Sequence, residues 1–450
     1  MIVVNLNLEN TGLEPRGLYG KLAEKASQGL VIVVEPREET MRLLADAAAA
    51  RVGEDEAVAK LAGELNSLSK GIPDYLRRSV EAEIVENLNR IAEYLSAAKK
   101  AGEATSRGLS VMLNLLGNTV SMIVSSHLKA LGIEAKWASA GQAGFTLVED
   151  YEPPWSHYVS LVKPEELRKA SAGVLVVSGR ACVDDEGGEA SLREGMGSVV
   201  SILAASELGV KEVYVPKANG GVYTADPWIA DRARIIPSLS YSEALELSRL
   251  GKWVVSPQAV ELAEELGVGI VVSSVQEPFK ELTTIGFEKA VERQIAKAVA
   301  IIPEMSIFTV EGAAMAGTPG VASAILGEVA KRGVSVCMIS QDASEVGITL
   351  VVKDKDLDRA LKGLREGFSR QRLVKRIRTQ RGVAVISAVG EGMRGTRGVA
   401  ARIFSAVAEA GVNVLAIAQG SSETSISFVV LMEDAEKAVK AVHDKVILGA

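Results

Sequence analysis

Short apolar runs alternate with helical periods between residues 30 and 274. The runs lie at residues 30–34, 173–177, 212–215, 253–255 and 270–272. Apolar residues in unbroken succession are typical of strands buried on both faces of a parallel sheet. Between the runs, apolar residues from Val80 to Leu95 recur at steps of three and four, which places them on one helix face. Strands alternating with helices predict an α/β layered domain.

Local signals mark two helix starts in this region. Ser240 with Glu243 three residues later forms a capping box. Ser256 followed by Pro257 gives an N-cap and a first helical residue, and Gly267 ends that helix. We therefore expect helices that begin near 241 and 257.

A repeat follows a junction near Ser274. Turn residues lead from there into an amphipathic stretch at about 288–302, and beyond it two copies of one pattern are offset by 78 residues. Met315-Ala-Gly-Thr-Pro-Gly-Val-Ala322 matches Met393-Arg-Gly-Thr-Arg-Gly-Val-Ala400, and Gln341–Glu345 matches Gln419–Glu423. Two copies without a gap predict a duplicated domain whose halves pack together.

Each copy predicts a βαββα(β) unit, with helices on one face of a small antiparallel sheet. In the first copy we expect a strand at 306–310, a helix at 321–331, and strands at 334–340 and 347–352. In the second copy the matching segments are 383–387, 399–409, 412–418 and 425–431.

Length and composition limit the class of protein. At roughly 150 residues per domain, 450 residues suggest about three folding units. Lys and Arg number 50 against 57 Asp and Glu, so the net charge is 50 − 57 = −7, which argues against a nucleic-acid partner. We find no unbroken apolar run of about 18 residues and no basic leader at the N-terminus, so we expect no membrane partner and a cytoplasmic protein. With two cysteines and three histidines, no metal site is expected.

The repeat carries candidate chemistry for binding an amino acid. Gly320 and Gly398 precede predicted helix starts, where free backbone amides and the helix dipole can receive a carboxylate. The polar side chains at 344–345 and 422–423 can receive an ammonium group. Alternatively, the glycines only form turns and the serines only cap. Two copies with the same polar set favour ligand binding.

These motifs, with Gly411-Val-Asn-Val414, resemble the ACT domain, a module that binds amino acids and regulates biosynthetic enzymes. The resemblance implies an effector site at Met315, Thr318, Gly320, Val321, Ala322, Ser335, Val336, Cys337, Ser344 and Glu345 in the first copy, and at Asn413, Ser422 and Glu423 in the second. Lysine or threonine is the implied effector. Cys337 stands where the family often has an acidic or amide side chain, which leaves the effector's identity open.

The middle of the chain resembles aspartokinase. Gly221-Val-Tyr-Thr-Ala-Asp-Pro227 and the block from Leu239 to Lys252 match the family's nucleotide-side segment. The resemblance implies an amino-acid-kinase domain at 1–300, with an open, mostly parallel sheet and helices on both faces. Two α+β ACT domains (βαββαβ) at 301–380 and 381–450 follow. It implies ATP with magnesium as cofactor, held by Gly221, Tyr223, Asp226 and Lys252, and phosphorylation of the aspartate side-chain carboxylate.

The N-terminus departs from the family. Where aspartokinases have Lys-Phe-Gly-Gly-Thr-Ser, this chain has Asn5-Leu-Asn-Leu-Glu-Asn10. The lysine is replaced by Asn5 and the second glycine by Leu8, whose side chain is expected to block the approach of backbone to phosphate. Glu9 adds a negative charge beside a polyanion.

Three more segments depart in the same direction. The family's Gly-Glu appears as Gly117-Asn118, its Gly-Arg-Gly-Gly-Ser-Asp loop contains Glu194 and Ser198, and its Thr-Asp-Val falls in 216–219 without a carboxylate. Arg193 or Lys217 could replace one missing cation. Loss of one charge-stabilising contact typically raises the barrier by about 3 kcal/mol, so four losses indicate a disabled centre. Lys252 remains the residual catalytic candidate.

Two main hypotheses follow. The first is a catalytically impaired, amino-acid-sensing regulatory subunit that forms homo-oligomers through its ACT domains or assembles with an active kinase. The second is an active aspartate kinase that uses rearranged residues. A third, nucleic-acid binding through the basic run 370–381, is less favoured than a solvated face between the repeats. We expect His443 at the surface and Cys182 packed as a small hydrophobe.

Overall fold

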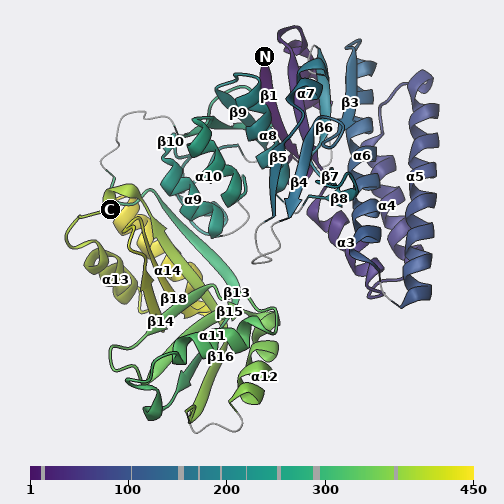
Figure 1. The fold of residues 1–450 in the computed structure, drawn as a ribbon. Helices are drawn as coiled ribbons and strands as arrows, with labels where there is room; N and C mark the ends of the chain where they lie inside the picture. Colours follow the sequence, from purple (N-terminus) through teal and green to yellow (C-terminus); the bar gives the residue numbers. More distant parts are fainter. Residues whose placement is uncertain are drawn as a thin grey trace. The chain divides into compact units, whose positions relative to one another are not determined.

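The structure is a computed structural model of the chain. It describes residues 1–11, 16–102, 104–149, 157–170, 173–192, 195–218, 220–250, 255–286, 294–368 and 373–449. The chain divides into two compact units. The first contains residues 1–222, 237–241 and 254–289, and the second contains 223–236, 242–253 and 290–450 (Figure 1).

An eight-stranded sheet forms the centre of the first unit, in the order β10-β12-β11-β9-β1-β2-β6-β3. The strands are β1 (Ile2–Asn7), β2 (Leu30–Glu35), β3 (Ala135–Ser139), β6 (Val174–Ser178), β9 (Glu212–Lys217), β10 (Ser238–Leu239), β11 (Gly269–Ser274) and β12 (Thr283–Ile285). All pairs are parallel except β11 with β12. The predicted α/β domain with a mostly parallel sheet is confirmed. The run at 253–255 lies mostly outside the described residues.

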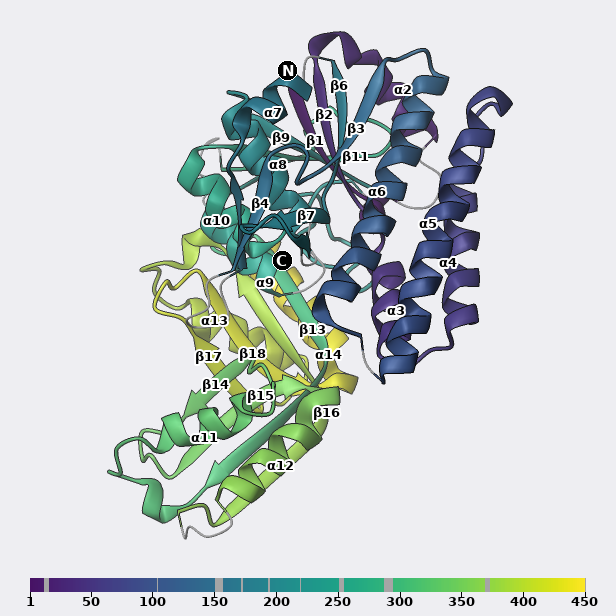
Figure 2. The same ribbon diagram turned by 45° about the vertical axis from the view of Figure 1, so that its right-hand side comes forward.

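Helices cover both faces of this sheet (Figure 2). They are α1 (Leu8–Thr11), α2 (Arg16–Glu24), α3 (Glu38–Ala48), α4 (Glu54–Leu68), α5 (Asp74–Ala101), α6 (Ser106–Ala130), α7 (Pro164–Ala170), α8 (Met196–Glu207) and α10 (Pro257–Leu266). The predicted apolar face from Val80 to Leu95 is buried in α5. Ser256 caps α10, because its Oγ accepts a hydrogen bond from the Ala259 amide, and Gly267 ends the helix in a left-handed conformation.

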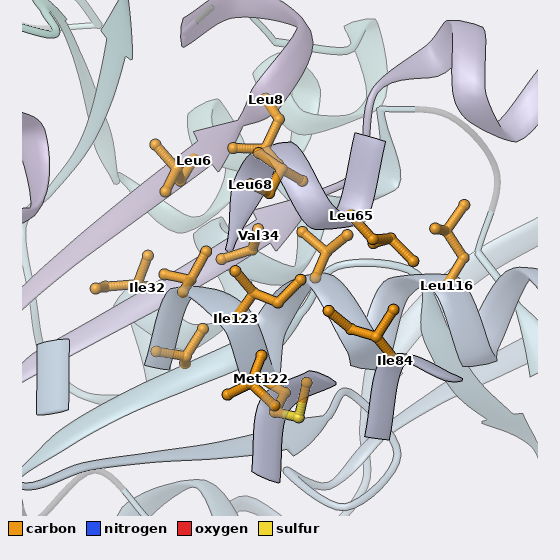
Figure 3. Close-up of a cluster of buried hydrophobic side chains, with 14 of the residues drawn as sticks. Leu6, Leu8, Ile32, Val34, Leu65, Leu68, Ile84, Leu116, Met122 and Ile123 are labelled. Atoms are coloured by element: carbon orange, nitrogen blue, oxygen red, sulfur yellow. The ribbon is translucent and has the colours of Figure 1, made fainter. Parts of the chain in front are cut away.

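Alternate residues of the central strands face a large apolar core. Leu6 and Val34 pack there against Leu116 and Ile123 of α6 (Figure 3). Among the described residues, α6 alone has the length and composition to cross a membrane, and 67% of its most apolar window is buried inside the protein. Such burial is what a core helix of a folded domain shows.

A second, four-stranded sheet in this unit has the order β5-β4-β7-β8, and the sequence patterns above do not predict it. It contains β4 (Phe145–Glu149), β5 (His157–Leu161), β7 (Ala181–Asp184) and β8 (Glu189–Ser191). Cys182 lies in β7, where it is buried as expected and its Sγ donates to the Phe145 carbonyl oxygen. Burial raises the pKa of this thiol to about 11.

The two repeats of the second unit share a six-stranded antiparallel sheet, β14-β15-β13-β16-β18-β17. Its strands are β13 (Ala298–Glu311), β14 (Met338–Gln341), β15 (Gly347–Lys353), β16 (Arg376–Val389), β17 (Ala416–Gln419) and β18 (Ser425–Leu431). The helices are α11 (Val321–Ala330), α12 (Leu357–Gly367), α13 (Val399–Glu409) and α14 (Ala435–Val442). The α+β architecture expected for two ACT domains is thus present.

Both central strands run through both repeats. The first residues of β13, 298–302, pair with 385–389 of β16, whereas its last residues, 305–311, pair with 376–383. Separate apolar cores lie under the helices of the first and second repeats. A third, containing Met305, Met338 and Val429, draws on strands of both.

Two predicted strands are shorter than expected. The strand predicted at 334–340 begins only at Met338, and the one at 412–418 begins only at Ala416. Val334 and Val412 nevertheless pack into the cores under the helices. Their burial produces an apolar pattern that continues ahead of each strand, which is why the pattern overestimates the length.

Candidate functional site

The carboxyl ends of β1, β2 and β6 meet at one edge of the parallel sheet, where ligands bind in open α/β folds. Asn7 pairs with Glu35, and Val34 pairs with Ser178. The first turn of α8 packs against the same edge, since Gly197 lies against the side chain of Glu35. Two of the segments that depart from the aspartokinase pattern, the N-terminal strand and the start of α8, therefore meet here.

Asn5 is part of a closed polar chain. Its side chain is 1% exposed, and its Nδ2 donates to the Ser201 Oγ at 3.1 Å. The Ser201 hydroxyl in turn donates to the Gly197 carbonyl oxygen at 2.9 Å. Where the resemblance puts a phosphate-binding lysine, the chain has a neutral side chain already held inside the fold.

Leu8 differs from the expectation. The chain enters the short helix α1 at Leu8, and the leucine side chain is 1% exposed in the same apolar core as Leu6 and Leu68 (Figure 3). It therefore fills the core and does not project toward a ligand. Glu9 lies beside Arg37, with Oε2 and Nε 3.9 Å apart, so an arginine partly balances its charge.

No local pattern in the sequence predicts that Glu35, the last residue of β2, lies at this edge. It is 2% exposed, and its carboxyl group faces the side-chain amide of Asn5 and the backbone of Gly195 and Gly197. Burial raises the pKa of its carboxyl above the usual 4.5, and the nearby Arg180 guanidinium and these donors oppose that rise. A carboxyl group, not an open cradle, thus occupies the edge of the sheet.

The other substituted positions are also engaged or buried. The Ser198 Oγ lies 3.2 Å from the Ser256 Oγ at the start of α10. The Oδ1 atom of Asn118 is buried without a hydrogen-bond partner in the described part of the chain. Lys217 lies half-buried at the end of β9, and burial lowers the pKa of its ammonium group. Arg193 and Glu194 lie outside the described residues.

The predicted nucleotide-side residues do not form one polar cluster. Gly221 is buried with a positive φ of 44°. Tyr223 forms a β-bridge with Ile235, and the exposed Asp226 accepts a hydrogen bond from the Trp228 amide at 2.9 Å. Lys252 lies outside the described residues. The role of these residues stays a prediction.

Residues 223–236 pack with the second repeat. Ala225 and Ala230 belong to the apolar core under α13 and α14. The Thr224 Oγ1 lies 2.9 Å from the Nε2 of His443, which is fully buried. The expectation that His443 is at the surface is wrong, because this segment, distant in sequence, covers it.

Helix α9 (Tyr241–Arg249), which begins where the capping box predicts, contacts the second repeat through two carboxylates. Glu243 is 1% exposed; one of its oxygens accepts from the Lys297 Nζ and the other from the Glu391 amide, each at 2.9 Å. Glu246 accepts from the Ser425 hydroxyl at 3.0 Å. Glu391 and Ser425 flank the loops that carry the ACT motif, so α9 is attached to the base of those loops.

The two ACT motifs have the same geometry. Glu345 and Glu423 both have positive φ, 57° and 55°. Each accepts a hydrogen bond from a glycine amide of the facing turn, Gly317 at 2.9 Å and Gly395 at 2.7 Å. Each glutamate therefore already ties two loops together, and its Oε2 is engaged before any ammonium group arrives.

The remaining predicted effector residues divide by exposure. Met315 and Val321 are buried in the core of the first repeat. Thr318 donates to the Ala314 carbonyl oxygen at 2.9 Å, and Gly320 caps α11 with a φ of 87°. The exposed residues are Ala322, Ser335, Cys337, Ser344 and Asn413, whereas Val336 and Ser422 are partly buried.

Comparison with known proteins agrees with this architecture. The amino acid kinase family matches residues 71–274, and the ACT domain matches residues 308–368 and 386–446. An aspartate kinase of Stutzerimonas stutzeri is 32% identical over 288 residues, which are 63% of this chain and 69% of that enzyme. The chain belongs to the aspartokinase family.

Solved aspartokinases have the same fold. Escherichia coli aspartokinase III in complex with aspartate and ADP aligns over 99% of both chains with a TM-score of 0.80 at 18% identity. The same enzyme with lysine and aspartate gives 0.75 at 19% identity over 99% of both chains. A bifunctional aspartokinase/homoserine dehydrogenase of Haemophilus influenzae is 36% identical over 226 residues, 50% of this chain. The match spans only 28% of that longer relative.

The aspartokinase family implies ATP with magnesium, and the sheet edge of this member does not fit them. Among the described residues, no three His, Cys, Asp or Glu side chains gather to hold a metal ion. The carboxyl ends of the central strands hold the buried Glu35 carboxyl and the Asn5 amide, which is bonded to Ser201. A pocket of about 390 Å³ between α5 and α6 has four alanines in its lining and contains none of these residues.

Three described arginines in the basic run of this aspartokinase homologue pair with carboxylates. Arg376 and Arg378 both pair with Glu311, the first at 2.8 Å. Arg381 pairs with Asp358 at 2.6 Å. These pairs agree with a solvated face between the repeats; residues 369–372 lie outside the described residues.

Proposed function

We propose that this aspartokinase homologue is a catalytically silent regulatory subunit that senses an amino acid of the aspartate family. One observation carries the proposal: the edge of the sheet where phosphates would lie is closed by the buried Glu35, Asn5 and Ser201. A triphosphate would need the same space and the same donors that these side chains already occupy.

The sensing half of the proposal is supported by the duplicated ACT motif. Both copies retain the helix-start glycines Gly320 and Gly398, and both retain the same glutamate-to-glycine tie between loops. A ligand carboxylate would bind at the start of α11 or α13, and its ammonium group beside Ser344 or Ser422. We propose lysine or threonine as the effector, because the E. coli relative was solved with lysine.

The proposed partners are a second copy of this chain, joined through the ACT sheets, and an active kinase whose response the effector adjusts. We propose the cytoplasm as the place of action. Size-exclusion chromatography with light scattering, with and without effector, measures the assembly. A monomer under all conditions contradicts the proposed homo-oligomer.

A coupled ADP-release assay with aspartate and magnesium ATP tests the silent centre. We expect the signal to equal that without aspartate. Lys217→Ala is the matched control, since Lys217 is the half-buried cation at the same edge. Turnover that depends on aspartate and disappears in Lys217→Ala or Lys252→Ala establishes the alternative, an active kinase with rearranged residues.

Isothermal titration with lysine, threonine and methionine tests the sensing claim. We expect one of them to bind, and we expect Ser344→Ala or Ser422→Ala to weaken binding by about tenfold through loss of one hydrogen bond to a charged group. Ser340→Ala, a change in β14 outside the motif, is the control and leaves the affinity unchanged. Absence of heat with all three amino acids contradicts amino-acid sensing.

A further inference from the structure

Glu35 requires an explanation, because a carboxyl group inside a protein is costly unless hydrogen bonds compensate its lost hydration. It follows four buried apolar residues, Val31 to Val34, and it is 2% exposed. It is also not at a turn tip, since it still pairs with Asn7 of β1. Something in its surroundings must favour a carboxyl group at this point.

The space around Glu35 is shaped by two glycines. A Cβ placed on Gly197 would lie 2.4 Å from the Glu35 Cγ and 2.6 Å from its Oε1. A Cβ on Gly179 would lie 2.9 Å from the same Cγ. Such distances are well inside van der Waals contact, so any larger residue at either position would displace the carboxyl group. The side chain and the two glycines fit one another.

The groups that face the carboxyl group are donors or a cation. The backbone of Gly195 and Gly197 belongs to the first turn of α8, a helix of 12 residues whose N-terminus has a partial positive charge. Asn5 adds a side-chain donor, and the Arg180 guanidinium, 6% exposed, adds a full charge. Donors that converge in this way form a site for an oxyanion.

We propose that Glu35 is a resident ligand: its carboxyl group occupies an oxyanion site at the N-terminus of α8 and closes that site to free carboxylates and phosphates. The donors from Gly195, Gly197 and Asn5 together make up this site, the α8 nest. This goes beyond the proposed function, because a chain can lack kinase activity whether or not its own side chain fills the nest. When the Glu35 side chain is removed, the nest binds a small oxyanion, either a carboxylate or a phosphate.

Chemical rescue of Glu35→Ala tests the proposal, since the truncation leaves the α8 nest without its occupant. We expect the Tm of Glu35→Ala to fall by several degrees and to recover substantially in tens of millimolar acetate or phosphate. Sodium chloride at the same ionic strength has no such effect, and the wild-type Tm shifts far less. Recovery with acetate alone indicates a carboxylate-sized site, and recovery with phosphate alone a phosphate-sized one; either supports the proposal. Equal responses of variant and wild type overturn it.

A second variant keeps the test informative if Glu35→Ala does not fold. Glu35→Leu retains the bulk and removes the acceptors, so the amides of the α8 nest lose their partner. We expect hydrogen exchange at 195–199 to become roughly tenfold faster, because a local hydrogen bond limits exchange there. Leu44→Met, a core change away from the nest, serves as control. Unchanged exchange in Glu35→Leu overturns the proposal, whatever the assay of kinase activity shows.

Discussion

The sheet edge of the first unit and the ACT loops of the second use the same contact in opposite surroundings. At the sheet edge, the carboxyl group of Glu35 faces glycine amides and is 2% exposed. In the ACT loops, Glu345 and Glu423 accept from glycine amides on exposed turns. A Cβ on Gly197 collides with a carboxyl group, whereas one on Gly320 meets nothing within 4 Å.

The comparison shows that a carboxylate beside glycine amides has different effects in different surroundings. Where it is buried it consumes the donors that a ligand would need, and the site closes. Where it is exposed it ties two loops together and leaves the neighbouring helix start in contact with solvent. The family likeness is shared by both regions, but only the second keeps space beside its glycines.

The largest expected effect concerns the buried carboxylate of the second unit. Lys297→Ala removes a cation that pairs with the buried Glu243 carboxylate, and loss of one partner of such a pair typically costs about 4 kcal/mol. We expect the Tm of the second unit to fall sharply in calorimetry. Lys331→Ala, which breaks the exposed pair with Glu328, is the matched control and changes the Tm little. Similar small changes in both variants contradict a structural role for Glu243.

Gly197→Ala sharpens the comparison at the sheet edge. Because the new methyl group overlaps the Glu35 carboxyl, we expect a loss of about 2 kcal/mol, in the range for overpacked cores. Urea denaturation measures it. The double variant Glu35→Ala/Gly197→Ala should be less destabilised than the sum of the two changes. Simple additivity argues that the two side chains do not compete for space.

The pH dependence of stability tests the burial of Glu35. Since the pKa of the Glu35 carboxyl is raised above 4.5 in the folded state, the folded protein keeps this carboxyl protonated up to a higher pH than the unfolded chain does. The contribution of the protonated carboxyl to the free energy of unfolding is therefore fully present below the pKa of the unfolded state. It is lost as the pH rises through the pKa of the folded state, by at most about 1.4 kcal/mol per pH unit. The stability of wild type relative to Glu35→Gln should decrease with rising pH. A constant difference excludes the raised pKa.

Gly320→Ala has the smallest expected effect. No atom lies within 4 Å of the added methyl group, so only the positive φ of 87° is strained, at about 1 kcal/mol. The loss is measured by urea denaturation of the full chain. Gly327→Ala, in the same helix with open space and ordinary φ, should be neutral or stabilising. A loss as large as that of Gly197→Ala removes the contrast between the two regions.

The sequence predicted the elements that local chemistry decides. Ser256 and Gly267 bound α10 as expected, and the 78-residue offset located α11 and α13, because caps and periodicity depend on neighbours in the chain. The sequence also shows where the chain departs from the aspartokinase pattern. It does not show the structural effect of each departure: the Leu8 side chain, for example, packs into the core.

The missed residues depend on distant partners. Glu35 follows an apolar run, where a polar residue ordinarily marks a turn, and only the approach of α8 from far along the chain makes it buried. His443 ends a helical tail, and only Thr224 from another segment covers it. No local pattern contains either partner, so the burial of both side chains required the tertiary structure.

Strands β13 and β16 continue without interruption from one repeat into the other. Neither repeat therefore contains all the strand residues with which its part of the sheet pairs. Cutting the chain between the copies would leave each fragment with an unpaired edge. A fragment made for crystallography or titration should therefore keep both repeats together with residues 223–236, which pack against the second one, and the two repeats should melt in one transition. Duplication here has produced one continuous sheet that carries two copies of the ACT motif.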